Sequence, residues 1–230
     1  MPVVWEVVSK PSMLTGRCLL LFTLLLLAAT AGADDTLINA AERGNTAEVK
    51  RLLDAGATVN SRAAHGRNAV LAATQGGHAE TAKLLIARGA DVNAQDDISD
   101  SAFLLAGARG HTEIVRAALA AGANLNSTNR YGGTALIPAC HYGHVDTVRL
   151  LLTSAINVDH VNNLGWSALL EAVILGDGGA RHAEIVKLLI AHGANVNLAD
   201  RQGVTPLAHA EQRGQRAVSE LLRAAGARSR

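Results

Sequence analysis

Residues 66–93 read GRNAVLAATQGGHAETAKLLIARGADVN, and this pattern recurs along most of the 230-residue chain. An alanine-rich stretch ends at Gly77, a second stretch with apolar residues at helical spacing ends at Gly89, and Val92-Asn93 follow. A glycine just past a helix adopts a left-handed conformation that costs other residues energy. Two such glycines in one unit therefore predict two short helices.

The two glycines recur with a fixed period. The first series falls at Gly44, Gly77, Gly110, Gly143, Gly176 and Gly214, with steps of 33 residues until the last step of 38. The second series falls at Gly56, Gly89, Gly122, Gly193 and Gly226. Self-similarity at such a period indicates a solenoid of stacked units.

The unit resembles the ankyrin repeat, which has a 33-residue period and a Thr-Pro-Leu start, here carried by Thr205-Pro206-Leu207. The resemblance implies an all-α ankyrin-repeat solenoid of about six helix-turn-helix repeats with short β-hairpin loops, filling residues 34–230. The expected repeats cover residues 35–63, 64–96, 97–129, 130–162, 163–200 and 201–227. Tyr131–Ala139 and His160–Trp166 also resemble a bacterial exported type, which implies a periplasmic interaction protein.

The sequence pattern of residues 1–33 predicts a cleavable signal peptide. Lys10 and Arg17 precede an apolar run over residues 18–29, and Ala31-Gly32-Ala33 supply the small residues of a cleavage site. The start is Met1 or Met13. We expect a periplasmic or secreted protein that no longer contacts the membrane after cleavage, and the alternative is an anchor formed by an uncleaved signal.

Four departures from the repeat predict local changes. Ala155 replaces the second glycine of repeat four, so its turn should be strained or altered, and Ser99 replaces the opening glycine of repeat three. Pro138 falls inside a first helix, where it removes a backbone donor and crowds the preceding carbonyl. Repeat five holds five extra residues, Asp177–Arg181, which we expect to form a flexible surface loop.

The side chains that could carry chemistry are scattered. His78, His111, His144 and His182 share one repeat position, but stacked helices lie about 10 Å apart, whereas zinc ligands reach their ion at about 2 Å. We therefore expect no metal, and we expect each histidine to form local hydrogen bonds that hold its turn. Cys140 should be a buried apolar residue without a disulfide partner. No catalytic constellation is present, so we expect neither an enzyme nor a cofactor.

The net charge of +1 gives no electrostatic reason to bind nucleic acid, which leaves another protein as the expected partner of a monomer. In the ankyrin family, partners usually contact the hairpin tips and the exposed face of the first helix. The resemblance therefore implies a partner-binding surface of Arg130, Tyr131, His141, Tyr142, Leu164 and Trp166. Tyrosine, tryptophan and arginine dominate binding energy at interfaces, although these aromatic side chains could instead pack locally against the stack.

A second function stays open. His141, Tyr142 and the repeat-five loop could form a small-ligand site of an accessory factor or an enzyme. The missing catalytic constellation favours an adaptor that binds a protein through its concave face.

Overall fold

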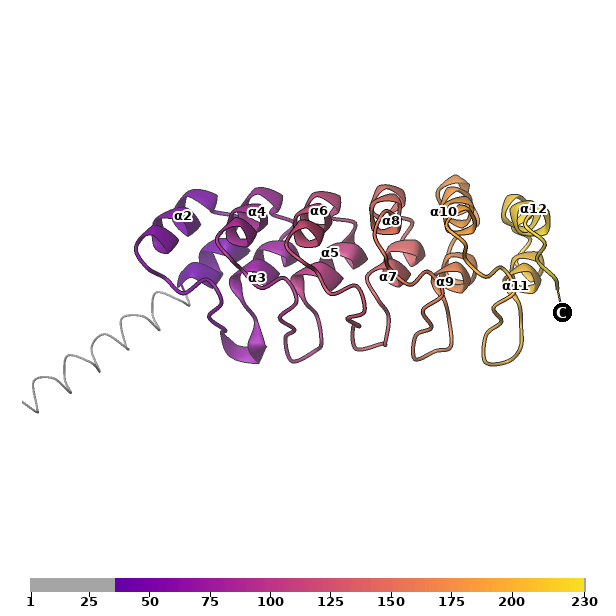
Figure 1. Ribbon diagram of the computed structural model, residues 1–230, viewed down its shortest axis with the longest axis horizontal. Helices are drawn as coiled ribbons and strands as arrows, with labels where there is room; N and C mark the ends of the chain where they lie inside the picture. Colours follow the sequence, from indigo (N-terminus) through magenta and orange to yellow (C-terminus); the bar gives the residue numbers. More distant parts are fainter. Residues whose placement is uncertain (1–35, 230) are drawn as a thin grey trace, which may run out of the picture.

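The computed structural model describes residues 36–229, and their regular elements are helical (Figure 1). After a helix over residues 36–42, the elements are α2 (Thr46–Asp54), η1 (Ala64–Gly66), α3 (Ala69–Gln75), α4 (Ala79–Ala87), α5 (Ala102–Arg109), α6 (Thr112–Ala120), α7 (Leu136–His141), α8 (Val145–Leu152), α9 (Ala168–Ile174), α10 (Ala180–Ala191), α11 (Pro206–Gln212) and α12 (Arg216–Ala224). None of the helices within residues 36–229 combines the length and apolar character needed to cross a bilayer.

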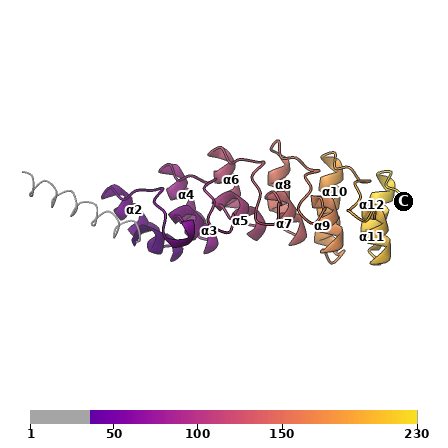
Figure 2. The same ribbon diagram turned by 90° about the horizontal axis from the view of Figure 1, so that it is seen from below.

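The helices pair into six repeats that stack into one elongated solenoid, so the predicted fold is confirmed (Figure 1). The first helices α3, α5, α7, α9 and α11 form one row, and the second helices α2, α4, α6, α8, α10 and α12 form another (Figures 1 and 2). The loops between repeats project from the row of first helices. The predicted signal peptide, residues 1–33, lies outside the described residues.

Alanine at one repeat position allows the first helices to pack closely. All six alanines at this position are fully buried: Ala40, Ala73, Ala106, Ala139, Ala172 and Ala210. Gly107 is tighter still, because a Cβ on it would lie 2.8 Å from the Cβ of Ala135. Larger apolar side chains, such as the fully buried Phe103, fill the space between the two rows.

The loops are tight turns with little strand pairing, each closed by a backbone hydrogen bond such as that from the amide of Asn129 to the carbonyl of Gly133 at 3.0 Å. Within residues 36–229 the strand-like pairing is a single bridge between Arg62 and Asn68. A side-chain oxygen holds the tip of four loops: Oδ1 of Asn129, for example, accepts hydrogen bonds from the amides of Tyr131 and Gly133 at 2.9 and 3.0 Å. The same bonds form around the corresponding residues Asp96, Asn162 and Asp200. An Asx side chain thus reinforces the backbone bond that closes each of these loops.

Ser99 adopts a φ of 63° where the other repeats have glycine. The loop geometry is therefore kept in repeat three although the residue lacks the freedom of glycine. The altered turn predicted at Ala155 is confirmed, because Ala155 is not among the residues with positive φ and α8 ends one residue earlier than α6 does at the same position. At this turn the hydroxyl of Ser154 donates a hydrogen bond to the carbonyl of Leu151 at 2.6 Å.

Pro138 changes the start of α7 as its missing donor predicts. The amide of Ile137 donates to the carbonyl of Thr134 at 3.2 Å, and α7 begins one residue later than α5 and α9 do. In the neighbouring repeats the corresponding amide donates to a capping side chain, for example Leu170 to Ser167 Oγ at 3.3 Å. Thr134 Oγ1 is instead buried without a partner among the described residues.

The insertion in repeat five is only partly a loop, which corrects the expectation for Asp177–Arg181. α10 already begins at Ala180 and has 12 residues, against nine in α4 and α6. Oδ1 of Asp177 accepts from the amide of Gly179 at 2.8 Å and lies 2.7 Å from Nδ1 of His182. The extra residues therefore lengthen a helix and form a short bonded turn.

Candidate surface for partner binding

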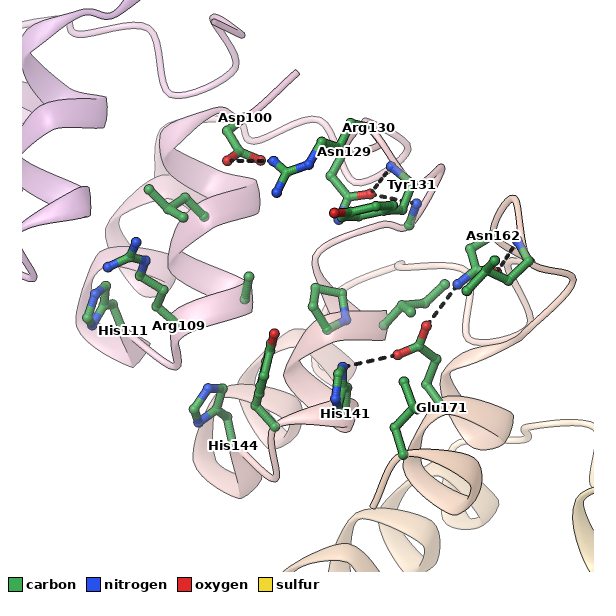
Figure 3. Close-up of a pocket in the computed structure, with 18 residues that line it drawn as sticks. Asp100, Arg109, His111, Asn129, Arg130, Tyr131, His141, His144, Asn162 and Glu171 are labelled. Atoms are coloured by element: carbon green, nitrogen blue, oxygen red, sulfur yellow. Dashed lines mark hydrogen bonds and ion pairs between the residues drawn. The ribbon is translucent and has the colours of Figure 1, made fainter. Parts of the chain in front are cut away.

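A groove of about 940 Å³ lies where the loops meet the first helices of repeats three to five (Figure 3). The loops contribute Asp100, Arg130, Tyr131 and Leu164. The helices α5, α7 and α9 contribute Arg109, His141 and Glu171, and Tyr142 follows directly after α7. α7 packs between α5 and α9, so three successive repeats share this groove.

The structure gathers five of the six predicted partner-binding residues at this groove, namely Arg130, Tyr131, His141, Tyr142 and Leu164. Trp166 is partly buried and does not line it. Trp166 occupies the repeat position that Asp100 and Gly133 hold in the two preceding repeats. It therefore continues the same row beyond the end of the groove.

The rim of the groove exposes large apolar and aromatic side chains. Tyr131 is 57% exposed, Tyr142 56% and Leu164 52%. Leu175 adds a fourth exposed apolar side chain to the lining. Four of the six large apolar side chains that are exposed among the described residues thus line this groove, which makes it a candidate contact surface.

Arg130 forms the upper end of the groove in Figure 3. Its Nη1 lies 3.6 Å from Oδ2 of Asp100, and its guanidinium lies 4.8 Å from the ring centroid of Tyr131. Burial raises the pKa of Asp100, while the charge of Arg130 opposes that rise. The pair orients Arg130 and satisfies one of the two acidic groups of the groove.

Glu171 is the other acidic group, and our sequence analysis did not find it. It projects from α9 towards His141 and Asn162, and only 6% of it is exposed (Figure 3). Asn162 Nδ2 donates to Oε1 at 2.9 Å, and Oε2 lies 3.5 Å from Nδ1 of His141. The available signal was a single charge inside the apolar run of residues 168–175.

Burial shifts the pKa values of Glu171 and His141. Burial raises the pKa of Glu171 from 4.5 to about 7, although the hydrogen bond from Asn162 opposes the rise. Burial, together with the nearby His182, lowers the pKa of His141. His141 therefore favours its neutral form at neutral pH, whereas Glu171 changes between its neutral and ionised forms near pH 7. His141 also stacks on Tyr142, with ring centroids 4.2 Å apart.

His78 and His182 join neighbouring repeats, which was not expected, and His182 also makes the expected local bond, to Asp177 of its own turn. His78 Nε2 lies 3.0 Å from the carbonyl oxygen of Glu42, and His182 Nε2 lies 2.9 Å from that of His141. His111 is different: its Nε2 is buried without a partner among the described residues. Arg109 instead donates to the carbonyl of Gln75 at 3.1 Å.

The remaining candidates for chemistry are isolated. Cys140 is fully buried, and burial raises the pKa of its thiol well above the usual range. Within residues 36–229 no group of three histidine, cysteine, aspartate or glutamate residues is placed to hold a metal ion. The turn at Asp177 does not line the groove, so it does not join His141 and Tyr142 in the ligand site that we considered.

The repeat architecture and this groove define an ankyrin-repeat protein. The family description "Ankyrin repeats (3 copies)" matches residues 16–96, 103–178 and 158–229, so the chain belongs to this family. Ankyrin repeats are generally protein–protein interaction modules and are typically non-catalytic.

Several proteins similar to this chain are also described as ankyrin repeat proteins or domains. Over 57 residues the chain is 49% identical to the putative ankyrin repeat protein YahD of Escherichia coli (strain K12), a match that spans 25% of this chain and only 28% of that relative. An ankyrin repeat domain from Acinetobacter baumannii AYE has a TM-score of 0.81 at 50% identity, covering 84% of this chain and 98% of its own. The ankyrin repeat protein EF0377 has a TM-score of 0.78 at 42% identity, covering 81% of this chain and 96% of its own.

Proposed function

We propose that this protein is a non-catalytic adaptor that binds a partner protein through the groove of repeats three to five. The observation that carries this proposal is the exposure of Tyr131, Tyr142 and Leu164 around one groove. Rigid aromatic side chains bury much area at little cost in conformational entropy. The family to which the chain belongs supports a binding role in place of catalysis.

We also propose that binding takes place outside the cytoplasm, in the periplasm or after secretion. The support is the sequence of residues 1–33, with its positive flank, apolar run and small residues before Asp34. N-terminal sequencing of exported material tests this part, and a mature chain that retains residues 18–29 would contradict it.

The binding surface is tested by site-specific crosslinking in living cells. A photoreactive amino acid replaces Leu164 at the rim of the groove in one variant. In the control it replaces Arg116, which is exposed on α6 and does not line the groove. We expect a discrete crosslinked product from position 164 and none from position 116.

The same experiment includes substitutions that remove contact area. Tyr142→Ala should abolish the crosslink at position 164, because truncating a central anchor costs about 2 kcal/mol, or about 30-fold in affinity. Trp166→Ala should weaken it less, because Trp166 lies outside the groove. Arg67→Ala is the peripheral control, since Arg67 pairs with Glu42 in the first repeats. A crosslink that survives Tyr142→Ala unchanged in a folded protein would place the binding surface elsewhere.

Glu171 favours one alternative, a site for a small ligand. A buried carboxyl group with a pKa of about 7 beside an imidazole is an arrangement that can exchange protons with a ligand. No nucleophile accompanies the pair, because the thiol of Cys140 is fully buried. We therefore rank this function second to protein binding.

A further inference from the structure

The groove contains an arginine without a close counter-ion, and this charge indicates what the groove binds. Arg109 and Arg130 are the two cationic side chains of the lining that are charged at every physiological pH. Arg130 is paired with Asp100 at 3.6 Å. Arg109, on the opposite side in Figure 3, has no carboxylate within ion-pair distance among the described residues, although it interacts with Asp100 at longer range.

The surroundings of Arg109 strengthen its preference for an anion. His111 and His144 line the same end of the groove (Figure 3). His111 has a buried Nε2 without a partner, because Arg109 takes the hydrogen bond to the Gln75 carbonyl. Burial and the charge of Arg109 lower the pKa of His111, so His111 stays neutral and Arg109 carries the positive charge at this end of the groove. A carboxylate from outside would supply the counter-ion that Arg109 lacks among the described residues.

The opposite end of the groove does not supply a carboxylate that could pair with Arg109. Glu171 is buried, bonded to Asn162, and favours its neutral form below pH 7. Apart from Asn162 and His141, the lining near Glu171 is apolar, with Leu164 and Leu175 exposed at the rim. The groove therefore has an arginine without a close counter-ion, Arg109, in repeat three and an apolar end in repeat five.

We propose that the groove binds an acidic segment of the partner protein, with a carboxylate of that segment at Arg109 and its apolar side chains against Tyr142 and Leu175. This inference rests on the proposed function and narrows the partner to a chemical class. Charge complementarity at such a rim selects the partner and speeds its association.

The repeat geometry also predicts the spacing within that segment. Packed helices lie about 10 Å apart, and an extended chain advances about 3.3 Å per residue. Successive repeats should therefore receive side chains about three residues apart. Arg109, Tyr142 and Leu175 share one repeat position in repeats three, four and five. The bound segment should therefore contain an acidic residue and two apolar residues, with about three positions between one and the next.

The test uses a displayed library of random peptides selected on the immobilised protein. Peptides of about twelve residues are long enough to hold the predicted spacing of about six. We expect the retained peptides to be enriched in aspartate or glutamate, with apolar residues about three and six positions away. Their binding should weaken with increasing salt, because the contact at Arg109 is solvent-exposed.

A matched pair of variants locates the charge. Arg109→Gln removes the cation and keeps an amide donor for the Gln75 carbonyl, whereas Arg116→Gln removes an exposed cation of α6 that pairs with Glu113 outside the groove. We expect Arg109→Gln to weaken the selected peptides by about five- to tenfold, and Arg116→Gln to leave their affinity unchanged. Thermal melting of both variants checks that the fold is intact.

The outcomes separate this inference from the proposed function. Retained peptides that depend on Tyr142 but lack acidic enrichment, or that ignore Arg109→Gln, would overturn the acidic segment and leave groove binding standing. Peptides indifferent to Tyr142→Ala would contradict both. Failure to retain any peptide would overturn the acidic segment, while the crosslinking experiment would still decide the proposed function. Displacement of the peptides by free succinate would show that a small carboxylate, and not a peptide, is the preferred occupant.

Discussion

At the scale of single residues, burial decides the protonation of Glu171. The side chain lies between apolar neighbours of α9 and has Asn162 as its hydrogen-bond donor. A buried carboxylate that lacks a full set of donors is destabilised relative to its neutral form. The folded protein therefore ionises this group near pH 7, whereas the unfolded chain does so near its ordinary value of 4.5.

This difference predicts that Glu171→Gln stabilises the protein at alkaline pH. The raised pKa penalises the folded state as pH increases from about 4.5 to 7, and the penalty reaches about 3 kcal/mol above that window. Glutamine keeps the acceptor for Asn162 and cannot ionise. The gain in unfolding free energy of the variant should therefore be about 2–3 kcal/mol larger at pH 8 than at pH 5, as measured by urea denaturation.

Comparing the variant with the wild type separates the pH dependence caused by Glu171 from that caused by the histidines. Burial lowers the pKa of His111, His141 and His144, so their contribution is lost as pH falls below 6.5. Both proteins share that loss, and the difference between them removes most of it. Parallel stability curves from pH 5 to pH 8 would show that Glu171 is ionised throughout.

At the scale of elements, one proline distinguishes α7 from the other first helices. Pro138 leaves the hydroxyl of Thr134 buried and unpaired, whereas Ser101 and Ser167 cap α5 and α9 with the same group. A buried polar group without a partner costs free energy that a hydrogen bond would recover. Repeat four, which contributes His141 and Tyr142 to the groove, thus lacks the side-chain cap that its two neighbours have.

Pro138→Ala should therefore stabilise the protein. The new amide can donate to the Thr134 carbonyl, which frees the amide of Ile137 to donate to the Thr134 hydroxyl. We expect the new hydrogen bonds to raise the unfolding free energy by about 1 kcal/mol. Part of this gain is offset because the unfolded chain is more flexible without proline. The change is measured by thermal or chemical denaturation.

Pro206→Ala supplies the matched control for that substitution. Pro206 is the first residue of α11, where no amide donor is needed and the fixed φ suits a helix. Its replacement should lower the unfolding free energy by about 0.5 kcal/mol. If both substitutions shift the melting temperature in the same direction, the position of proline within the helix is not the cause.

At the scale of the whole molecule, a ladder of asparagine side chains links successive repeats. Asn93, for example, donates to the carbonyl of Gly122 at 3.2 Å and accepts from the amide of Asn124 at 2.7 Å. Asn60 and Asn197 make the same pair of bonds at the two ends of the solenoid. Asn126 makes neither bond within the described residues, because its partner would be the turn that Ala155 alters.

Asn93→Ala and Asn126→Ala should therefore differ in cost. Asn93→Ala breaks two bonds between repeats and should lower the unfolding free energy by about 1 kcal/mol. Asn126→Ala breaks no such bond and should stay within about 0.5 kcal/mol of wild type. Equal losses in chemical denaturation would mean that the ladder also operates at repeat four.

The sequence by itself determined the period, the six helix pairs and the repeat position of each candidate contact. Glycines such as Gly77 and Gly89, where the backbone needs a positive φ, and alanine at the close contacts are requirements of local geometry, so they are visible along the chain. For the same reason, the effects of Pro138 and Ala155 followed from residue type alone.

Only the tertiary structure decided which positions meet in space. Glu171 lies nine residues from Asn162 and thirty from His141, and stacking of α7 against α9 brings the three together. The same stacking ends the groove before Trp166 and carries histidine bonds to the previous repeat. Burial and the resulting pKa shifts depend on neighbours from other repeats, which a one-dimensional pattern does not specify.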